Sequence, residues 1–323
     1  MNQRLPLHNE EAMKHLTSFL KLIRWPNLLF IVLTQILFYY IVIPYCYRIA
    51  GVDTALANLT DGVFVVLLLA SVVIAAAGYI INDYYDIPID QINKPDRVLA
   101  SKGMSAKNAR VVYILLSVTG VFLSSFAGLA LRNLYIPVIN SGVVVALLFY
   151  SALLKKKMLI GNLVVSLMTA WVILVLTVSE HSLNTGANNA WPALLKISWV
   201  YAGFAFVTSI IREVIKDIED REGDKKLKCT TLPIVWGVRG VKVFTFAWIV
   251  ILLGGIVVVC MNLISSEKWL LAVYGILFLI LPLLWLTKKL FDAKSIAEFH
   301  RLSNLMKAIM LIGILSMVFF KFY

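Results

Sequence analysis

The residues best suited to chemistry in this chain are its acids, because most of them are gathered in two short segments. Of 18 Asp and Glu residues, four lie in residues 83–96 and six in residues 213–224. The three cysteines and four histidines form no cluster with them. Oxygen ligands without Cys or His favour Mg²⁺ over zinc or copper, and Mg²⁺ commonly takes its remaining ligands from water and substrate phosphates. The two segments therefore indicate metal-assisted binding of a phosphate-bearing substrate.

The first acidic segment directly follows an uncharged apolar run. Asn82, Asp86 and Asp90 recur at every fourth position, so on a continued helix they share one face, and Asp83 adjoins that face. Pro88 is unfavourable inside a helix because its ring clashes with the carbonyl four residues earlier. We therefore expect the helix to kink or end near Asp86, with Asp90 in the loop that follows.

The second acidic segment has the spacing of a helical stripe. Glu213, Asp217, Asp220 and Asp224 fall at i, i+4, i+7 and i+11. Carboxylates near a helix C-terminus face the negative end of the macrodipole, and like charges four residues apart repel. The alternative, that both segments are solvated helix ends, does not explain why each follows an apolar run and leads into basic residues. A divalent cation between the segments would compensate these costs.

Basic and polar residues beside the acids are candidates for holding substrates. Arg and Lys stabilise the charge on a departing phosphate, although most Lys and Arg at membrane borders are topology signals. The candidates for binding a diphosphate are Lys94, Arg97, Lys155, Lys216 and Tyr150.

The elements that must position these residues are membrane helices. Sixty per cent of the 323 residues are hydrophobic and 15% are charged, against about 45–50% and about 25% in ordinary soluble domains. This composition excludes a soluble globular domain, a disordered chain and a nucleic-acid module, despite the net charge of +12. Apolar runs near the ~20-residue length of a bilayer-spanning helix recur nine times, at residues 27–47, 62–81, 110–132, 134–154, 158–179, 193–211, 241–263, 268–287 and 303–320. The runs are too long for barrel strands and do not alternate, so we expect an all-α bundle.

The distribution of Lys and Arg predicts the orientation. Alternate connecting segments hold 25 of the 30 Lys and Arg, and the opposite set holds five. By the positive-inside rule the N-terminus and both acidic segments are cytoplasmic, in a multi-pass protein of the cell membrane. Residues 1–24 are expected to form an amphipathic segment on the membrane surface, or alternatively a continuation of the first span. Residues 25–323 are expected to form a single transmembrane domain.

The two segments together resemble a known family signature. Asn82-Asp83-xx-Asp86-xxx-Asp90 with Asp217-xx-Asp220-xxx-Asp224, after the second and sixth of nine spans, is similar to the paired aspartate motifs of the UbiA superfamily of intramembrane prenyltransferases. The resemblance implies a helical bundle around a central cavity that opens near the cytoplasmic face. It also implies that Mg²⁺ bridges Asn82, Asp86, Asp90, Asp217, Asp220 and Asp224 to a prenyl diphosphate. The same aspartates, with Asp83, are then the candidate catalytic residues.

The resemblance also implies roles for polar and aromatic residues near the acids. Prenyl transfer creates a cation-like carbon, which Tyr150, Tyr84 and Tyr85 are candidates to shelter by cation–π contact; the alternative is that these tyrosines are interfacial anchors. The candidates for binding the acceptor are Arg24, Asn27 and Asn162. For the two asparagines, simple hydrogen bonding between helices is the alternative.

The second segment is most similar to one branch of that superfamily, the geranylgeranylglycerol-phosphate geranylgeranyltransferases. The similarity lies in Arg212-Glu213-xx-Lys216-Asp217-Ile218-Glu219-Asp220-x-Glu222-Gly223-Asp224. It implies Mg²⁺-dependent transfer of a prenyl group, geranylgeranyl in that branch, to the hydroxyl of a prenylated glycerol phosphate in ether-lipid biosynthesis. The expected partners are a prenyl diphosphate, a lipid-like acceptor and membrane lipids, with no nucleic acid. Two alternatives stay open: prenylation of an aromatic acceptor in quinone-type biosynthesis, and a cation-coupled transporter, whose site would lie nearer the bilayer midplane.

Overall fold

Nine membrane-length helical segments make up the part of the chain that the structure describes. The computed structural model describes residue 17, residues 19–88, residue 91, residues 104–181 and residues 189–323. No sheet occurs in these ranges, and nine helices there are long and apolar enough to cross a membrane, as predicted. In chain order they are α2 with η1 and α3 (Trp25–Ile49), α4 (Asp61–Tyr85), α6 (Ala106–Ala130), α7 (Tyr135–Ala152), α8 (Ile160–Glu180), α9 (Trp191–Lys226), α11 (Gly237–Ser265), α12 with η6 and α13 (Trp269–Asp292) and α14 with η7 (Ile296–Lys321).

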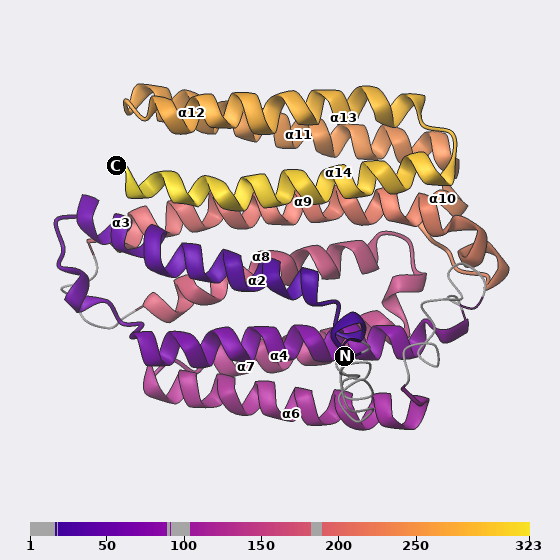
Figure 1. Cartoon of the computed structure of the whole chain (residues 1–323), viewed down its shortest axis with the longest axis horizontal. Helices are drawn as coiled ribbons and strands as arrows, with labels where there is room; N and C mark the ends of the chain where they lie inside the picture. The colour runs from indigo at the N-terminus through magenta and orange to yellow at the C-terminus, as the bar shows by residue number, and fades with distance from the viewer. Residues whose placement is uncertain (1–16, 18, 89–90, 92–103, 182–188) are drawn as a thin grey trace, which may run out of the picture.

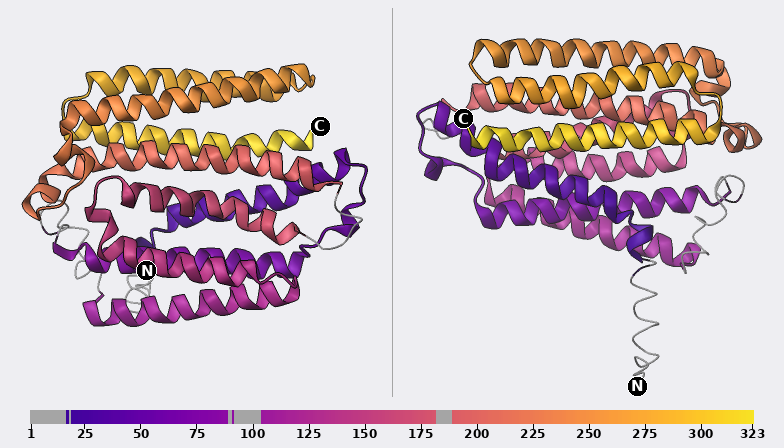
Figure 2. Two further views of the ribbon diagram at one scale, coloured as in Figure 1. Left: turned by 180° about the vertical axis from the view of Figure 1, so that it is seen from behind. Right: turned by 45° about the horizontal axis from the view of Figure 1, so that its top comes forward.

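The helices are stacked in layers across the bundle, and the first and last spans lie inside the stack (Figure 1). Figure 1 shows α4, α6 and α7 at the bottom, α2 and α8 in the middle, α9 and α14 above them, and α11 to α13 at the top. The view from behind in Figure 2 keeps this order. Helix α9 packs on α8, α14 and α11, so it joins the two halves of the bundle.

Two of the spans contain a single π-helical turn ahead of a proline. In the first span α2 (Trp25–Leu37) passes through η1 (Phe38–Val42) into α3 (Ile43–Ile49), which contains Pro44. In the eighth, α12 (Trp269–Gly275) passes through η6 (Ile276–Ile280) into α13 (Leu281–Asp292), which contains Pro282. A proline ring clashes with the carbonyl four residues back, and a wider turn accommodates it without ending the helix.

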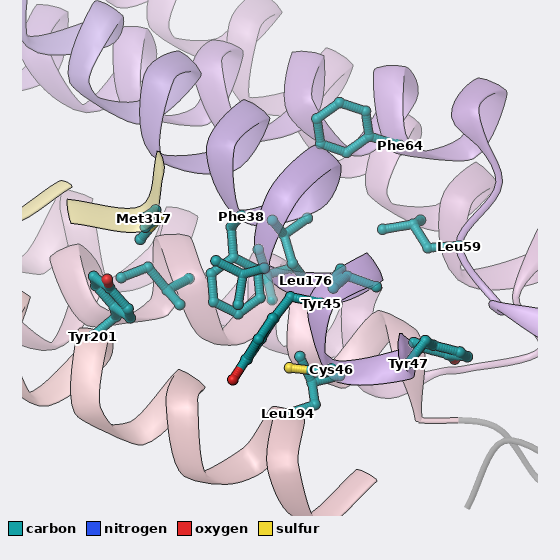
Figure 3. Close-up of a cluster of buried hydrophobic side chains, with 14 of the residues drawn as sticks. Phe38, Tyr45, Cys46, Tyr47, Leu59, Phe64, Leu176, Leu194, Tyr201 and Met317 are labelled. Atoms are coloured by element: carbon teal, nitrogen blue, oxygen red, sulfur yellow. The ribbon is translucent and has the colours of Figure 1, made fainter. Parts of the chain in front are cut away.

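The helices separate an apolar interior from an equally apolar outer surface. Figure 3 shows one buried cluster, in which Phe38 and Tyr47 from the first span pack with Leu176 of α8 and Leu194 of α9. On α6 the outward side chains that recur every three or four residues are large and apolar: Leu115, Val118, Phe122, Phe126 and Leu129. Such an exposed stripe is unfavourable in water and suits contact with lipid.

The ends of α4 and α9 set the position of the two acidic segments. Helix α4 ends at Tyr85 and Asp86 is its C-cap, as Pro88 led us to expect. Helix α9 has 36 residues, or about 54 Å at 1.5 Å per residue, which is longer than the ~30 Å hydrocarbon core. It therefore carries the second acidic segment on its own extension. It continues through Gly223 and ends at Lys226.

A break separates the N-terminal segment from the first span. The residues that the structure describes are helical up to Leu22, and Arg24 then has a positive φ of 51° before α2 begins at Trp25. The first span is therefore not extended straight back along the chain. Leu22 is buried with Ile80 of α4 and Ala109 of α6, so this segment packs against the bundle.

Candidate active site

The two acidic segments line the same cavity, although about 130 positions separate them in the sequence. The cavity has a volume of about 850 Å³. Its acidic lining comes from the end of α4 and from α9: Asp83, Asp86, Glu213, Asp217, Glu219, Asp220 and Asp224. Away from these acids the wall is largely apolar and includes Phe30, Leu147, Met168 and Trp171. An elongated molecule with an anionic end and an apolar tail would fit this distribution of polarity.

Asp86 on the first wall is held by two neighbours. The Asn82 amide donates to Asp86 Oδ2 at 2.6 Å, so these residues share a face as the four-residue spacing predicted. The Lys155 ammonium donates to Asp86 Oδ1 at 2.6 Å and to Asn82 Oδ1 at 3.3 Å. Burial lowers the pKa of Lys155 from its ordinary value, and the Asp86 carboxylate opposes that shift. Lys155 is thus a mostly buried cation at the edge of the acidic wall.

Lys155 reaches this place because of a tight turn between α7 and α8. The turn η5 (Leu154–Lys156) packs against Gly161, where an added Cβ would lie 2.8 Å from Lys155 Cα. The Lys156 carbonyl accepts a hydrogen bond of 2.8 Å from the Thr230 amide, which ties the turn to the segment after α9. The glycine therefore allows the close approach that aims Lys155 at Asp86.

The aspartates of α9 are also individually supported. The Asn162 amide on α8 donates to Asp217 Oδ2 at 2.9 Å. The Thr231 hydroxyl donates to Asp224 Oδ2 at 3.1 Å, and Lys216 lies 3.9 Å from Asp220. Such supporting contacts hold carboxylates in the orientation that a metal or phosphate site needs.

Asp83 and Arg24 form an ion pair at the same end of the bundle. The Arg24 guanidinium donates to Asp83 Oδ1 at 2.6 Å, and the Asp83 side chain is almost fully buried. Burial alone lowers the pKa of Arg24, but the Asp83 carboxylate outweighs it and raises the pKa above its ordinary value. Arg24 also lies over the Tyr79 ring at 5.4 Å. The pair fixes the start of α2 against α4.

The aromatic candidates separate into two groups. Tyr150 of α7 lines the cavity, where it lies close to the charges of Asp86 and Asp217. Tyr84 and Tyr85 do not belong to the lining: their rings pack edge to face at 5.1 Å, and Arg110 lies over Tyr84 at 5.6 Å. The interpretation of that tyrosine pair as a shelter for a carbocation is therefore wrong, because their side of α4 faces away from the cavity.

Three predicted residues fall outside the described residues: Asp90, Lys94 and Arg97. Among the lining residues that were not predicted as site residues are Tyr79, Arg212 and Lys307. Tyr79 could have been found from its spacing, one helical turn before the first acidic segment. Lys307 gave no such signal, because a lysine near the start of a span resembles an ordinary topology charge.

The donor set of the two walls fits Mg²⁺. Within the described ranges, no three His, Cys, Asp or Glu side chains converge closely enough to hold an ion by themselves. The Asp224 carboxylate nevertheless interacts with the like charge of Asp220 and, across the cavity, with that of Asp86. A cation between the walls would relieve this repulsion. Mg²⁺ is commonly bound by one or two carboxylates with substrate phosphates as further ligands.

Comparison with known protein sequences identifies related chains. The model of the UbiA prenyltransferase family matches residues 25–306. Digeranylgeranylglyceryl phosphate synthase from Saccharolobus solfataricus is 38% identical over 176 residues, which are 54% of this chain and span 57% of that enzyme. The enzyme of the same name from Methanothermobacter thermautotrophicus is 30% identical over 234 residues, 70% of this chain and 71% of the enzyme.

Comparison with solved structures shows the same fold. A structure concerned with digeranylgeranylglyceryl phosphate synthase in membranes has a TM-score of 0.63 and 24% identity, covering 94% of this chain and 97% of that chain. A UbiA homologue from Archaeoglobus fulgidus, bound to GPP and Mg²⁺, has a TM-score of 0.54 and 15% identity, covering 93% and 99%. At these identities the likeness establishes the arrangement of the helices.

Proposed function

Since the chain belongs to the UbiA prenyltransferase family, we propose that it transfers a geranylgeranyl group from its diphosphate to the hydroxyl of a prenylated glycerol phosphate. The product would be a diether precursor of membrane lipids. The names of the curated relatives support this acceptor class, although the first of them is matched over little more than half its length.

The observation that carries the proposal is that two acidic walls and a set of large apolar side chains line the same cavity. The end of α4 and the extension of α9 present carboxylates to the same space, and apolar side chains line the rest. A prenyl diphosphate has the same division into a charged and an apolar part, with a polyanionic head and a long hydrocarbon tail. The proposed domain, residues 25–323, supplies most of the lining of this space, and Lys21 and Arg24 of the preceding segment add to it.

Asn82, Asp86, Asp217, Asp220 and Asp224 are the described residues that would hold Mg²⁺, and Asp90, which lies outside the described residues, is the sixth predicted ligand. When bound, the ion supplies charge neutralisation to the departing diphosphate. A UbiA homologue was solved with GPP and Mg²⁺, which supports this cofactor.

The chain's own residues bind, orient and protect the reactants. Lys155 and Lys216 are placed to donate to diphosphate oxygens, and these bonds strengthen as the carbon–oxygen bond breaks. Tyr150 and Tyr79 line the space where the allylic carbon becomes cation-like, so their ring faces can stabilise it. The apolar walls keep water from that carbon, which leaves the acceptor hydroxyl as the attacking nucleophile.

The end of the bundle that carries Asp86 and Asp217, here called the acidic end, is proposed to face the cytoplasm. Segments on that side hold 25 of the 30 Lys and Arg. Labelling of single introduced cysteines in intact cells and in inverted vesicles tests this orientation.

Substitution of an aspartate from each wall tests the reaction. Asp86→Ala and Asp220→Ala are each expected to lower Mg²⁺-dependent transfer at least about 100-fold, because charge on the leaving group is no longer neutralised. Asp292→Ala changes an exposed acid outside the cavity and serves as the matched control. The assay uses purified protein, labelled geranylgeranyl diphosphate and a panel of glycerol-phosphate and hydroxybenzoate acceptors, with products identified by mass. Wild-type rates in either cavity variant would refute the assignment, and product from hydroxybenzoate alone would favour the aromatic alternative.

A further inference from the structure

Lys307 differs from the other cations of the cavity in having no acidic partner. Four lining cations each have a carboxylate within 4 Å: Arg24, Lys155, Arg212 and Lys216. Two more, Lys21 and Lys156, are exposed to solvent. Lys307 is half-buried, and in the described part of the chain no carboxylate lies within 4 Å of its Nζ. Its contacts are a neutral amide, Asn27 Oδ1 at 2.7 Å, and the Phe30 ring at 5.3 Å.

A half-buried ammonium without a counter-ion is costly, because it loses water and gains no opposite charge. Lys307 lies within a membrane-length helix, Ile296–Lys321, where ionisable side chains usually serve function. Asn27 supplies one acceptor for its three N–H groups. The remaining donors are therefore available to an anion in the cavity.

Arg212 adds a second unsatisfied donor nearby. One end of its guanidinium is paired with Glu213, but Nε is buried and has no hydrogen-bond partner within the described ranges. Arg212 and Lys307 line the same cavity, where the positive charge of each disfavours that of the other. An anion between α9 and α14 would satisfy the Arg212 Nε–H and offset this repulsion.

The position of this pair suits an acceptor better than the diphosphate. Arg212 precedes Asp217 by five residues and Asp220 by eight on α9, or about 7.5 Å and about 12 Å along the axis. An attacking hydroxyl must approach the allylic carbon to roughly 3–3.5 Å. The acceptor's own phosphate then lies farther from the aspartates than the diphosphate does, as Arg212 does along α9.

We propose that Lys307, with the Arg212 Nε–H, binds the phosphate of the acceptor and so selects phosphorylated glycerol over uncharged acceptors. The proposal rests on the proposed function and names the group that recognises its second substrate. Asn27 holds Lys307 in place, which gives this predicted acceptor residue a positioning role. Arg24, also predicted to bind the acceptor, is already neutralised by Asp83.

Acceptor discrimination tests the proposal. The kcat/KM of the wild type, Lys307→Met and Lys307→Arg is measured with a prenylated glycerol phosphate and with the same prenylated glycerol lacking its phosphate. Lys307→Met should lower kcat/KM for the phosphorylated acceptor about 10- to 100-fold, the range expected for losing a charge-assisted hydrogen bond. It should leave unchanged both the kcat/KM for the unphosphorylated acceptor and the KM for prenyl diphosphate. Lys307→Arg should restore most of the loss, and Lys196→Met on the exposed part of α9 is the matched control.

The assays are run in a sugar-headgroup detergent and again in phospholipid vesicles. A loss of discrimination in both media supports an acceptor site, whereas one seen only in vesicles would assign Lys307 to membrane-lipid headgroups and overturn the proposal. Equal losses of kcat/KM with both acceptors would show that Lys307 has a structural role and would overturn the proposal. If Lys307→Met does not fold, the two acceptors are compared with Lys307→Gln, which keeps a donor for Asn27. A wild type inactive with every glycerol phosphate would refute the proposed function itself, and this inference with it.

Discussion

Substituting Gly161 by alanine is predicted to weaken prenyl transfer by moving Lys155. An added Cβ would lie 2.8 Å from Lys155 Cα and 3.0 Å from the Leu154 carbonyl oxygen. Both atoms are backbone, so no flexible side chain can rotate away and the turn η5 itself must shift. That shift carries the Lys155 ammonium away from Asp86, which it now contacts at 2.6 Å.

The size of the effect is bounded by what Lys155 contributes. A charge-assisted hydrogen bond is worth about 1.5–3 kcal/mol, so Lys155→Met should lower kcat/KM for prenyl diphosphate about 10- to 100-fold. Gly161→Ala should cost a part of this, about 1–2 kcal/mol or roughly 5- to 30-fold. The loss should appear with prenyl diphosphate as the varied substrate, measured with purified protein at saturating acceptor.

A double-mutant cycle decides whether Gly161 acts through Lys155. If it does, the variant with both substitutions should be no worse than Lys155→Met alone, because the displaced group is already absent. Gly255→Ala introduces a Cβ on α11 into open space and is the control for a helical glycine. Wild-type kcat/KM in Gly161→Ala, or losses that multiply in the double variant, would refute the reasoning.

Two further substitutions distinguish effects on the acidic end from effects on the stability of the bundle. Asn162→Ala removes the amide that holds Asp217, and the Mg²⁺ concentration for half-maximal activity should rise about 10- to 100-fold. An increase in the acceptor KM alone, with unchanged Mg²⁺ dependence, would instead support the prediction that Asn162 binds the acceptor. Glu180→Ala should destabilise the fold by about 2–4 kcal/mol, because buried Glu180 accepts hydrogen bonds from the Tyr47 hydroxyl and from the Asn58 and Leu59 amides. Thermal unfolding in detergent should show this loss, with substrate KM values unchanged because Glu180 does not line the cavity.

Features that depend on local spacing were predictable from the sequence. The face shared by Asn82 and Asp86, the alignment of Asp217, Asp220 and Asp224 along α9, and the end of α4 before Pro88 follow from helical periodicity and proline sterics. The same rules could not show that Tyr84 and Tyr85 face away from the cavity. Tyr84 packs with α6 in a small apolar cluster, and the Tyr85 ring packs edge to face on Tyr84.

The sequence by itself determined the bundle and the two acidic faces. A bilayer requires about 20 apolar residues for each crossing, and a helix places every third or fourth residue on one side. Only the tertiary structure decided which cations and amides face the cavity. Lys307 meets Asn27 across 280 positions, and Asn162 meets Asp217 across 55. Such pairs depend on how the helices pack against one another, which the periodicity of a single helix does not encode.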